Sequence, residues 1–167
     1  QQAVLDKALD SFQHAIALKA DDPAYHNNYA LALARAKKYD DAQAELNKAA
    51  TLDPPNAGRY YYNLGALLVN SGQMAASEEA FKKAIEANPD YADAQYQYAI
   101  ALSAKMTVGA DGKMIAPPGM AEALQKYLQL APNGSNAEAA KGMLETLGAK
   151  IETNYTNPNA KPPAKKK

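Results

Sequence analysis

Apolar residues recur along most of this chain at the spacing of one helix face. In three segments, a small or medium-sized residue is followed four positions later by a large apolar one, and three positions after that by another residue of the same face. Positions i, i+4 and i+7 lie on one side of an α-helix, and a proline that follows ends the helix because it lacks an N–H group. The sets are Ala42, Leu46, Ala49 and Pro54; Ser77, Phe81, Ala84 and Pro89; and Met120, Leu124, Tyr127 and Pro132.

A second amphipathic segment precedes each of these helices, at residues 23–37, 58–72 and 92–105. Pro54 and Pro89, which end two successive units, lie 35 residues apart. A period of this length in an Ala-rich chain is typical of stacked helical hairpins, in which each hairpin covers the apolar face of its neighbour.

These residues resemble the tetratricopeptide-repeat (TPR) family. In the middle copy the family's signature positions hold Leu64, Gly65, Phe81, Ala84 and Pro89. The family's Trp-like position instead holds His26, Tyr61 and Gln95 in the three copies, and Ser77 replaces the usual Ala. The resemblance covers about residues 3–132 and implies an all-α fold, a right-handed superhelical stack of helix-turn-helix hairpins.

The repeat map predicts one array over residues 1–152 and a flexible tail over 153–167, which has no helical periodicity, three prolines and a lysine end. The array is expected to consist of a half repeat at 3–20, repeats at 23–56, 58–91 and 92–134, and a capping helix at 135–151. Because the half repeat lacks a partner and the chain begins with Gln1, we expect a fragment or a processed form. A bacterial periplasm and a cytoplasm both fit the sequence.

The third repeat contains an insertion at 106–118, within KMTVGADGKMIAPPG. Two short arms flank a centre rich in Gly and Asp, which predicts a small β-hairpin, and the prolines after it suit the first turn of the next helix. One interpretation is a tolerated surface insertion. The other is a protruding flap that packs on the array or contacts a partner through Met106, Val108, Met114 and Ile115.

Charge and composition argue against several classes of protein. The 167 residues include 18 basic and 18 acidic side chains, so the net charge does not favour nucleic acid or an anionic membrane surface. No apolar run approaches the roughly 20 residues that a membrane-spanning helix needs. The absence of cysteine excludes disulfides, thiolate chemistry and cysteine-based zinc sites.

The sequence does not predict an enzyme. Its two histidines, His14 and His26, fall on different expected helices, and His26 stands where the family places a packing aromatic. No phosphate-binding loop, nucleophile elbow or metal-ligand spacing is present. We therefore expect no catalytic residues, no metal and no cofactor.

The resemblance implies a concave groove along the first helix of each hairpin, suited to a peptide or an extended segment of a partner protein. Tyr61 is expected on the packing face and Tyr62 in this groove. An ordinary solvated helix face is the competing interpretation. The predicted groove positions are Asn27, Asn28, Leu31 and Arg35; Arg59, Tyr62, Asn63, Ala66 and Asn70; and Asp93, Tyr96, Gln97 and Ile100.

Two further expectations concern partners. Some members of the family bind a terminal carboxylate through Lys, Asn and Arg in the groove; Asn63 fits, but the basic positions hold Asn27, Asp93 and Gln97, so we predict against such a clamp. The alternative to a peptide groove is a structural array within a larger multidomain or secreted bacterial protein. That array would self-associate through the open N-terminal half repeat.

Overall fold

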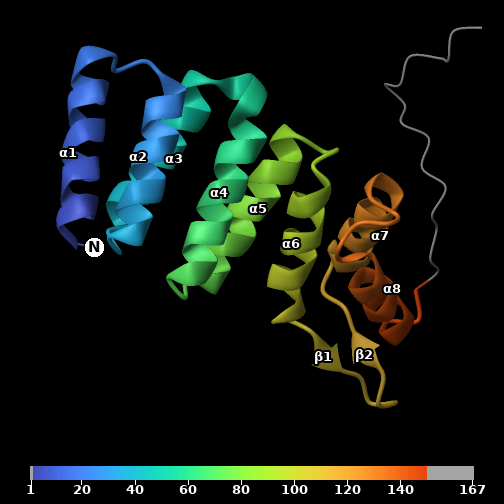
Figure 1. Cartoon of the computed structure of the whole chain (residues 1–167). Coiled ribbons are helices and arrows are strands. Elements are labelled where there is room, and N and C mark those ends of the chain that lie inside the picture. The colour runs from blue at the N-terminus through green and yellow to red at the C-terminus, as the bar shows by residue number, and fades with distance from the viewer. Residues whose placement is uncertain (1, 150–167) are drawn as a thin grey trace, which may run out of the picture.

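The computed structural model describes residues 2–149, and helices form nearly all of its regular structure (Figure 1). A short 3-10 turn, Pro54–Asn56, precedes one helix, and two strands, β1 (Thr107–Val108) and β2 (Met114–Ile115), interrupt the series near its end. The predicted all-α stack is confirmed. The helices are α1 (Gln2–Leu18), α2 (Pro23–Arg35), α3 (Tyr39–Leu52), α4 (Ala57–Asn70), α5 (Met74–Ala87), α6 (Ala92–Ser103), α7 (Met120–Leu130) and α8 (Ala137–Thr146).

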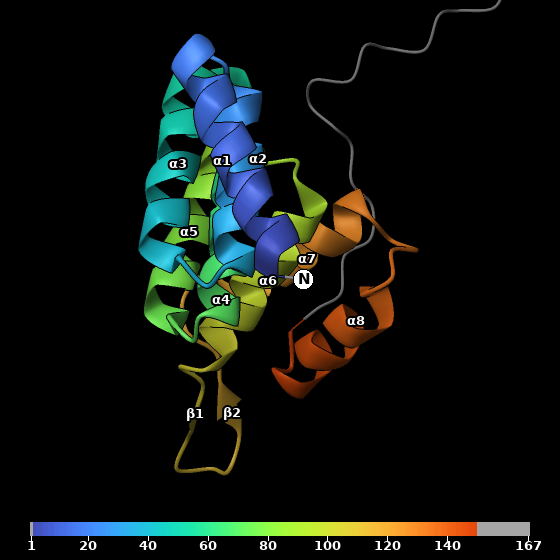
Figure 2. The ribbon, with the colours of Figure 1, turned by 60° about the vertical axis from the view of Figure 1, so that its left-hand side comes forward.

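The helices pack as successive hairpins, α2 with α3, α4 with α5 and α6 with α7. The second helix of each hairpin also contacts the first helix of the next, α3 on α4 and α5 on α6. Figures 1 and 2 show the resulting stack, with α1 against α2 at one end and α8 against α7 at the other. This arrangement places α2, α4 and α6 in register along the stack.

Helices α2, α4 and α8 end with the same backbone motif. The residue after each C-cap has a positive φ, 60° at Lys37, 78° at Gly72 and 65° at Gly148. The next N–H then returns to a carbonyl five residues earlier, as from Lys38 to Leu33 at 2.9 Å. This is the Schellman motif, which favours glycine at the positive φ. In its ending, α8 therefore resembles the first helix of a hairpin.

Buried apolar side chains form two main clusters along the stack. One cluster joins α1 to α5 and the other joins α6 to α8. Fully burying a leucine-sized side chain contributes about 1.5–3 kcal/mol, so these clusters supply most of the driving force for stacking. Their most deeply buried members include Leu33, Leu46 and Leu68 in the first, and Met120, Leu124 and Leu144 in the second.

The insertion forms the expected β-hairpin. Strands β1 and β2 are antiparallel, with Thr107 opposite Ile115 and Val108 opposite Met114, and the hairpin projects from one edge of the stack (Figures 1 and 2). The expectation that prolines enter the next helix is wrong. Helix α7 begins at Met120, after Gly119, whose φ of 88° turns the chain into the helix instead.

The predicted tail at 153–167 lies outside the described residues, as do residues 150 and 151 of the predicted capping helix. This helix is shorter than predicted, because α8 begins at Ala137 and its Schellman motif ends it at Thr146. Within the described part, α8 packs on α7 through Ala140 and Leu144, both buried. None of the helices in residues 2–149 has both the length and the apolar character needed to cross a bilayer.

Candidate functional site

The predicted groove positions all lie on α2, α4 and α6, the first helices of the three hairpins. On α4 they recur every three or four residues from Arg59 to Asn70, so they form one stripe along the helix. We call the positions on these three helices the groove. Its exposed members are Asn28, Leu31, Arg35, Arg59, Asn70, Asp93 and Ile100; its half-buried members are Asn27, Tyr62, Asn63, Ala66, Tyr96 and Gln97.

An amide pair links two of the groove helices. The Asn63 side chain on α4 donates from Nδ2 to Oδ1 of Asn27 on α2 at 2.9 Å. Asn27 in turn donates from its own Nδ2 to Oδ1 of Asn28 at 3.1 Å. Residues 36 positions apart in sequence thus form a continuous row of amides across the first two repeats.

Tyr62 is held beside the amide row by two other aromatic rings. Its ring centroid lies 4.9 Å from that of Tyr91 and 5.8 Å from that of Phe81. Burial raises the pKa of the Tyr62 hydroxyl above its ordinary value of about 10, and the Asp93 carboxylate raises it further. Burial likewise raises the pKa of Tyr91. Tyr62 is therefore partly desolvated and held by packing, while part of its ring remains at the surface.

Two hollows lie near the two ends of the α4 stripe. The first has a volume of about 410 Å³, and we call it the Arg35 hollow; its lining is Leu31, Ala34, Arg35, Lys37, Tyr39, Leu67 and Asn70. The second has a volume of about 220 Å³, and we call it the Arg59 hollow; its lining is Pro55, Asn56, Gly58, Arg59, Asn88 and Tyr91. Neither lining contains a carboxylate.

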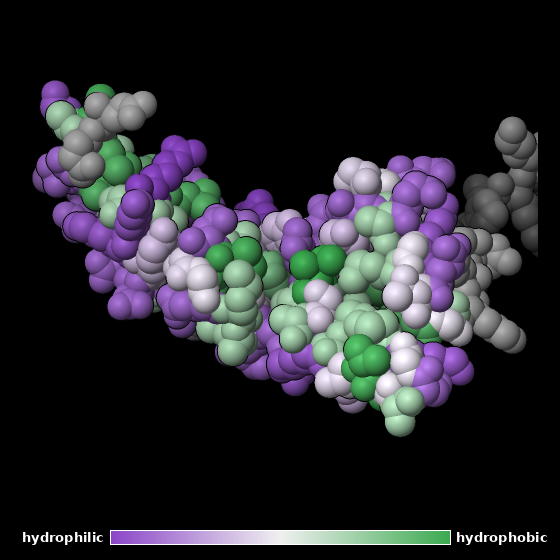
Figure 3. Space-filling model, turned by 90° about the horizontal axis from the view of Figure 1, so that it is seen from below, coloured by the Kyte–Doolittle hydropathy of each residue, from purple (hydrophilic) through white to green (hydrophobic). Residues whose placement is uncertain are grey.

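Seen from below Figure 1, the array bends along its length, and its surface is a mosaic of apolar and polar residues (Figure 3).

Of the three consecutive tyrosines of α4, Tyr61 packs against the buried clusters, as expected. Tyr60, for which the sequence predicts no role, is the most buried of the three, with 1% of its surface exposed. Its hydroxyl donates to Oδ2 of Asp53 at 3.0 Å, and the guanidinium of Arg59 lies 5.2 Å from its ring centroid. Tyr61 and Tyr62 are both half-buried. The ring and hydroxyl of Tyr60 thus orient the Arg59 guanidinium.

The four predicted flap residues do not act together. Met106 packs against the cluster of α6 to α8, and Met114 is half-buried. Val108 and Ile115 are 65% and 53% exposed, although both are apolar. The structure therefore separates a base that belongs to the core from a hairpin whose two outer apolar side chains face solvent.

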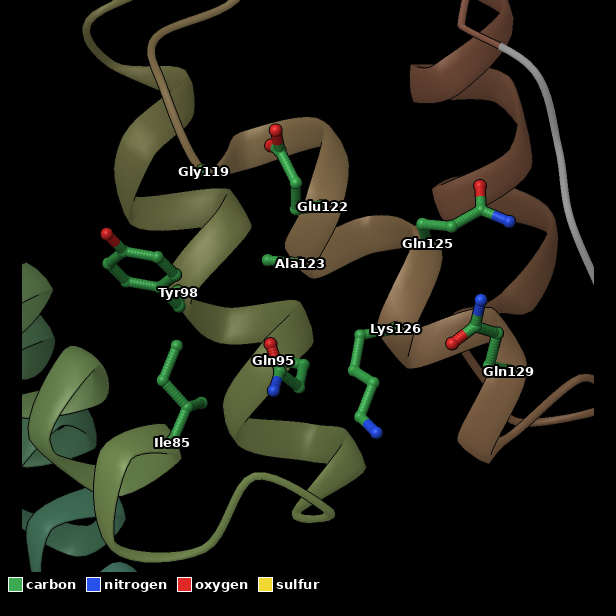
Figure 4. A pocket seen from close by; sticks show the side chains of 9 residues that line it. All are labelled: Ile85, Gln95, Tyr98, Gly119, Glu122, Ala123, Gln125, Lys126 and Gln129. Carbon is green, nitrogen blue, oxygen red and sulfur yellow. The ribbon is translucent and has the colours of Figure 1, made fainter. Parts of the chain in front are cut away.

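A third hollow, of about 510 Å³, lies beside α7 and contains none of the predicted site residues. Figure 4 shows Ile85 of α5 and Tyr98 of α6 on one side of it, with Gln125 and Gln129 of α7 on the other. Lys126, which also lines it, forms an ion pair with Asp90 at 3.0 Å. We call this the α7 hollow. Its three amide side chains come from α6, which carries Gln95, and from α7, which carries Gln125 and Gln129.

His26 has a structural position. It is fully buried, its Nε2 donates to the Ala20 carbonyl at 2.9 Å, and its Nδ1 lies 2.5 Å from Oε2 of Glu45. Gln95, at the matching position of the third hairpin, donates to the Pro89 carbonyl at 2.9 Å. Both side chains reach a carbonyl six residues earlier and so secure the turn before the helix. Among residues 2–149, histidines and carboxylates do not gather in threes as a metal site would require.

Comparison with known proteins identifies the family of these repeats. A family model described as a tetratricopeptide repeat matches residues 23–56 and 58–91, the two hairpins that carry the amide row. The chain is a tetratricopeptide-repeat protein. It is accordingly a helical-repeat scaffold for interactions between proteins.

One related sequence and two solved structures are similar to this TPR protein. The Hsp70-Hsp90 organizing protein of Triticum aestivum is 30% identical over 124 residues, and the matched region covers 74% of this chain but only 20% of that protein. Among solved structures, MamA superposes with a TM-score of 0.65 at 20% identity, covering 88% of this chain and 81% of that one. PilF of Pseudomonas aeruginosa superposes with a TM-score of 0.51 at 22% identity, covering 83% and 66%. At these identities the two structures show the fold alone.

Proposed function

We propose that this TPR protein is a non-catalytic interaction module that holds an extended segment of a partner protein in the groove of α2, α4 and α6. The observation that carries the proposal is the Asn63–Asn27 hydrogen bond, which fixes amide side chains across two repeats. An amide has two N–H donors and a carbonyl acceptor. Asn63 uses one N–H for Asn27, so its other N–H and its carbonyl oxygen suit the backbone of an extended peptide.

Tyr62 adds an anchor to this row. Because Tyr91 and Phe81 pack against its ring, binding a partner would immobilise little that is not already ordered. Aromatic side chains in such positions are frequent centres of binding energy at interfaces. A half-buried tyrosine beside two amides therefore favours an interaction surface over an ordinary solvated helix face.

The proposal does not extend to the C-terminal tails of chaperones. The wheat relative is named for organising Hsp70 and Hsp90, but the clamp that some members use for a terminal carboxylate needs basic side chains. This chain places Asn27, Asp93 and Gln97 at those positions. Hydrogen bonds from charged donors to a carboxylate contribute about 1.5–3 kcal/mol each, so losing several removes most of the affinity of a clamp.

Affinity capture of partners tests the proposal. Immobilised wild-type chain is compared with Tyr62→Ala and Asn63→Ala in the groove, and with Gln129→Ala, which changes the α7 hollow instead. A partner retained by wild type and by Gln129→Ala but lost from both groove variants supports groove binding. A partner retained equally by all four proteins contradicts it, provided that circular dichroism shows unchanged helicity.

A second candidate, self-association through α1, is favoured by two exposed apolar residues. Val4 is 72% exposed and Leu18 is 83% exposed, near the two ends of the helix. Light scattering over a range of concentrations separates the candidates. A stable monomer supports the groove proposal, whereas a concentration-dependent dimer that Val4→Ser with Leu18→Ser abolishes supports self-association.

A further inference from the structure

We propose that the partner segment is acidic, with two carboxylates at least about five residues apart, one bound by Arg35 and Lys37 and the other by Arg59. This inference rests on the groove binding proposed above and specifies the chemistry of the partner. It is carried by the charges of the two hollows at the ends of the α4 stripe.

The Arg35 hollow combines an apolar floor with two cations. Leu67 in its lining is buried and Leu31 is 41% exposed. The hollow of about 410 Å³ beside them has room for an apolar side chain of the partner. Arg35 and Lys37 are exposed, and within residues 2–149 neither forms an ion pair. Two unneutralised cations beside an apolar hollow are complementary to an acidic side chain next to an apolar one.

The Arg59 hollow carries a single cation, which is oriented before any partner binds. Nη2 of Arg59 donates to the Tyr60 hydroxyl at 3.4 Å, and the guanidinium lies over the Tyr60 ring. Tyr60 is fixed in turn by its hydrogen bond to Asp53. A guanidinium supported in this way keeps donors free for a planar carboxylate, and it loses less side-chain freedom on binding than an unsupported one.

The separation of the hollows along the α4 axis gives the smallest spacing of the two acids, because Arg35 lies on the neighbouring helix α2. Arg59 and Asn70 lie 11 residues apart on α4, so they share a face of the helix. At about 1.5 Å of rise per residue the distance along the axis is about 16 Å. An extended peptide advances about 3.3 Å per residue and spans this distance in about five residues.

Groove residues between the two hollows and on α6 add to the specificity for the partner segment. Tyr62 and Asn63 lie between them and are uncharged at neutral pH, so the middle of the segment needs no charge. Asp93 lies on α6, close enough to Tyr62 to raise the pKa of that hydroxyl. Besides burial, Asp93 also raises the pKa of Tyr91, which lines the Arg59 hollow, whereas Arg59 lowers it. The acid in that hollow therefore has to lie on the Arg59 side, away from the Asp93 carboxylate.

Fluorescence anisotropy with designed peptides tests the inference on the full chain. The probe is a labelled peptide of Ser, Ala and Leu with two Glu residues about five positions apart. Its controls carry Gln or Lys in place of both Glu, or place the two Glu side by side. We expect the probe to bind at least about tenfold more tightly than each control, and to weaken as salt rises from about 0.1 M to about 1 M, where the Debye length falls from about 10 Å to about 3 Å.

Charge variants locate the binding. Arg35→Gln with Lys37→Asn, and separately Arg59→Gln, should each weaken binding of the probe by about tenfold. Lys48→Gln, which removes an exposed lysine from α3 outside the groove, should leave it unchanged. Equal losses from all these variants would mean a general charge effect and would overturn the inference.

The outcomes separate this inference from the proposed function. If a neutral or basic control peptide binds as well as the probe and Tyr62→Ala abolishes its binding, the groove is confirmed and the acidic partner is wrong. If no peptide of any charge binds, and captured partners bind Tyr62→Ala as well as wild type, both the groove proposal and the acidic partner are wrong. Tight binding that needs Tyr62 and the two cationic ends supports both.

Discussion

Gly65 of α4 lies directly against the ring of Phe81 on α5. A Cβ atom placed on Gly65 would come within 2.5 Å of Cε1 of Phe81, which is closer than atoms pack. The matching positions in the other hairpins hold Ala30 with Leu46 and Ala99 with Leu124, all fully buried. The glycine and the phenylalanine thus form a matched pair, because the large ring needs the space that a methyl group would fill.

Gly65→Ala should therefore destabilise the chain by about 1–3 kcal/mol, the usual cost of overpacking a core. The cost should fall sharply in the background of Phe81→Leu, which reproduces the Ala–Leu pairing of the neighbouring hairpins. Urea denaturation of the two single variants and the double variant measures this coupling. Gly142→Ala is the matched control, because nothing lies within 4 Å of the Gly142 position and alanine favours a helix. Additive effects of the two core substitutions would contradict the account.

Lys37 is the only residue other than glycine with a positive φ among residues 2–149. Since a side chain in this conformation is strained and glycine is not, Lys37→Gly should stabilise the chain by up to about 1 kcal/mol. Lys38→Gly, at a φ of −88°, should instead destabilise it. Thermal or urea unfolding measures both. A loss of stability in both variants would show that the strain at Lys37 is negligible.

Tyr62 and Tyr91 should make the folded chain sensitive to alkaline pH. Burial raises the pKa of both hydroxyls above about 10, so the unfolded chain loses these protons first. Their contribution to stability is fully present below pH 10 and is lost as the pH rises through the raised folded values. Replacing both by Phe should flatten the decline of the unfolding free energy above about pH 10. Identical pH profiles for the variant and wild type would count against this burial.

The β-hairpin should be dispensable for folding. Its outer residues, Val108 and Ile115, are exposed, whereas Met106 and Ala116 at its base contact the core. Replacing residues 107–115 with an Asn-Gly turn should keep the helical circular dichroism and change the unfolding free energy by less than about 1 kcal/mol. A cooperative loss of helicity would show that the hairpin supports the stack.

The repeat pattern predicts the fold well because each hairpin repeats the same helix-facing positions and the same terminal proline. The side chains that complete the groove were harder to predict. Lys37 lines the Arg35 hollow. It occupies the position of the Schellman motif that Gly72 and Gly148 occupy in α4 and α8, and a lysine there does not predict this turn. Tyr60 is buried because the turn after α3 brings Asp53 to its hydroxyl. The two hollows depend on how neighbouring hairpins are placed, which helical periodicity does not describe.

Site-specific photo-crosslinking tests the central claim most directly. A photoreactive phenylalanine analogue replaces Tyr62 in the groove of one sample and Tyr98, which lines the α7 hollow, in another. Irradiation in an extract of the source cells, followed by mass spectrometry, identifies what each position contacts. We predict that position 62 crosslinks to an extended segment of one partner protein and that position 98 does not. Crosslinks to the same partner at position 98 alone would contradict a groove formed by α2, α4 and α6.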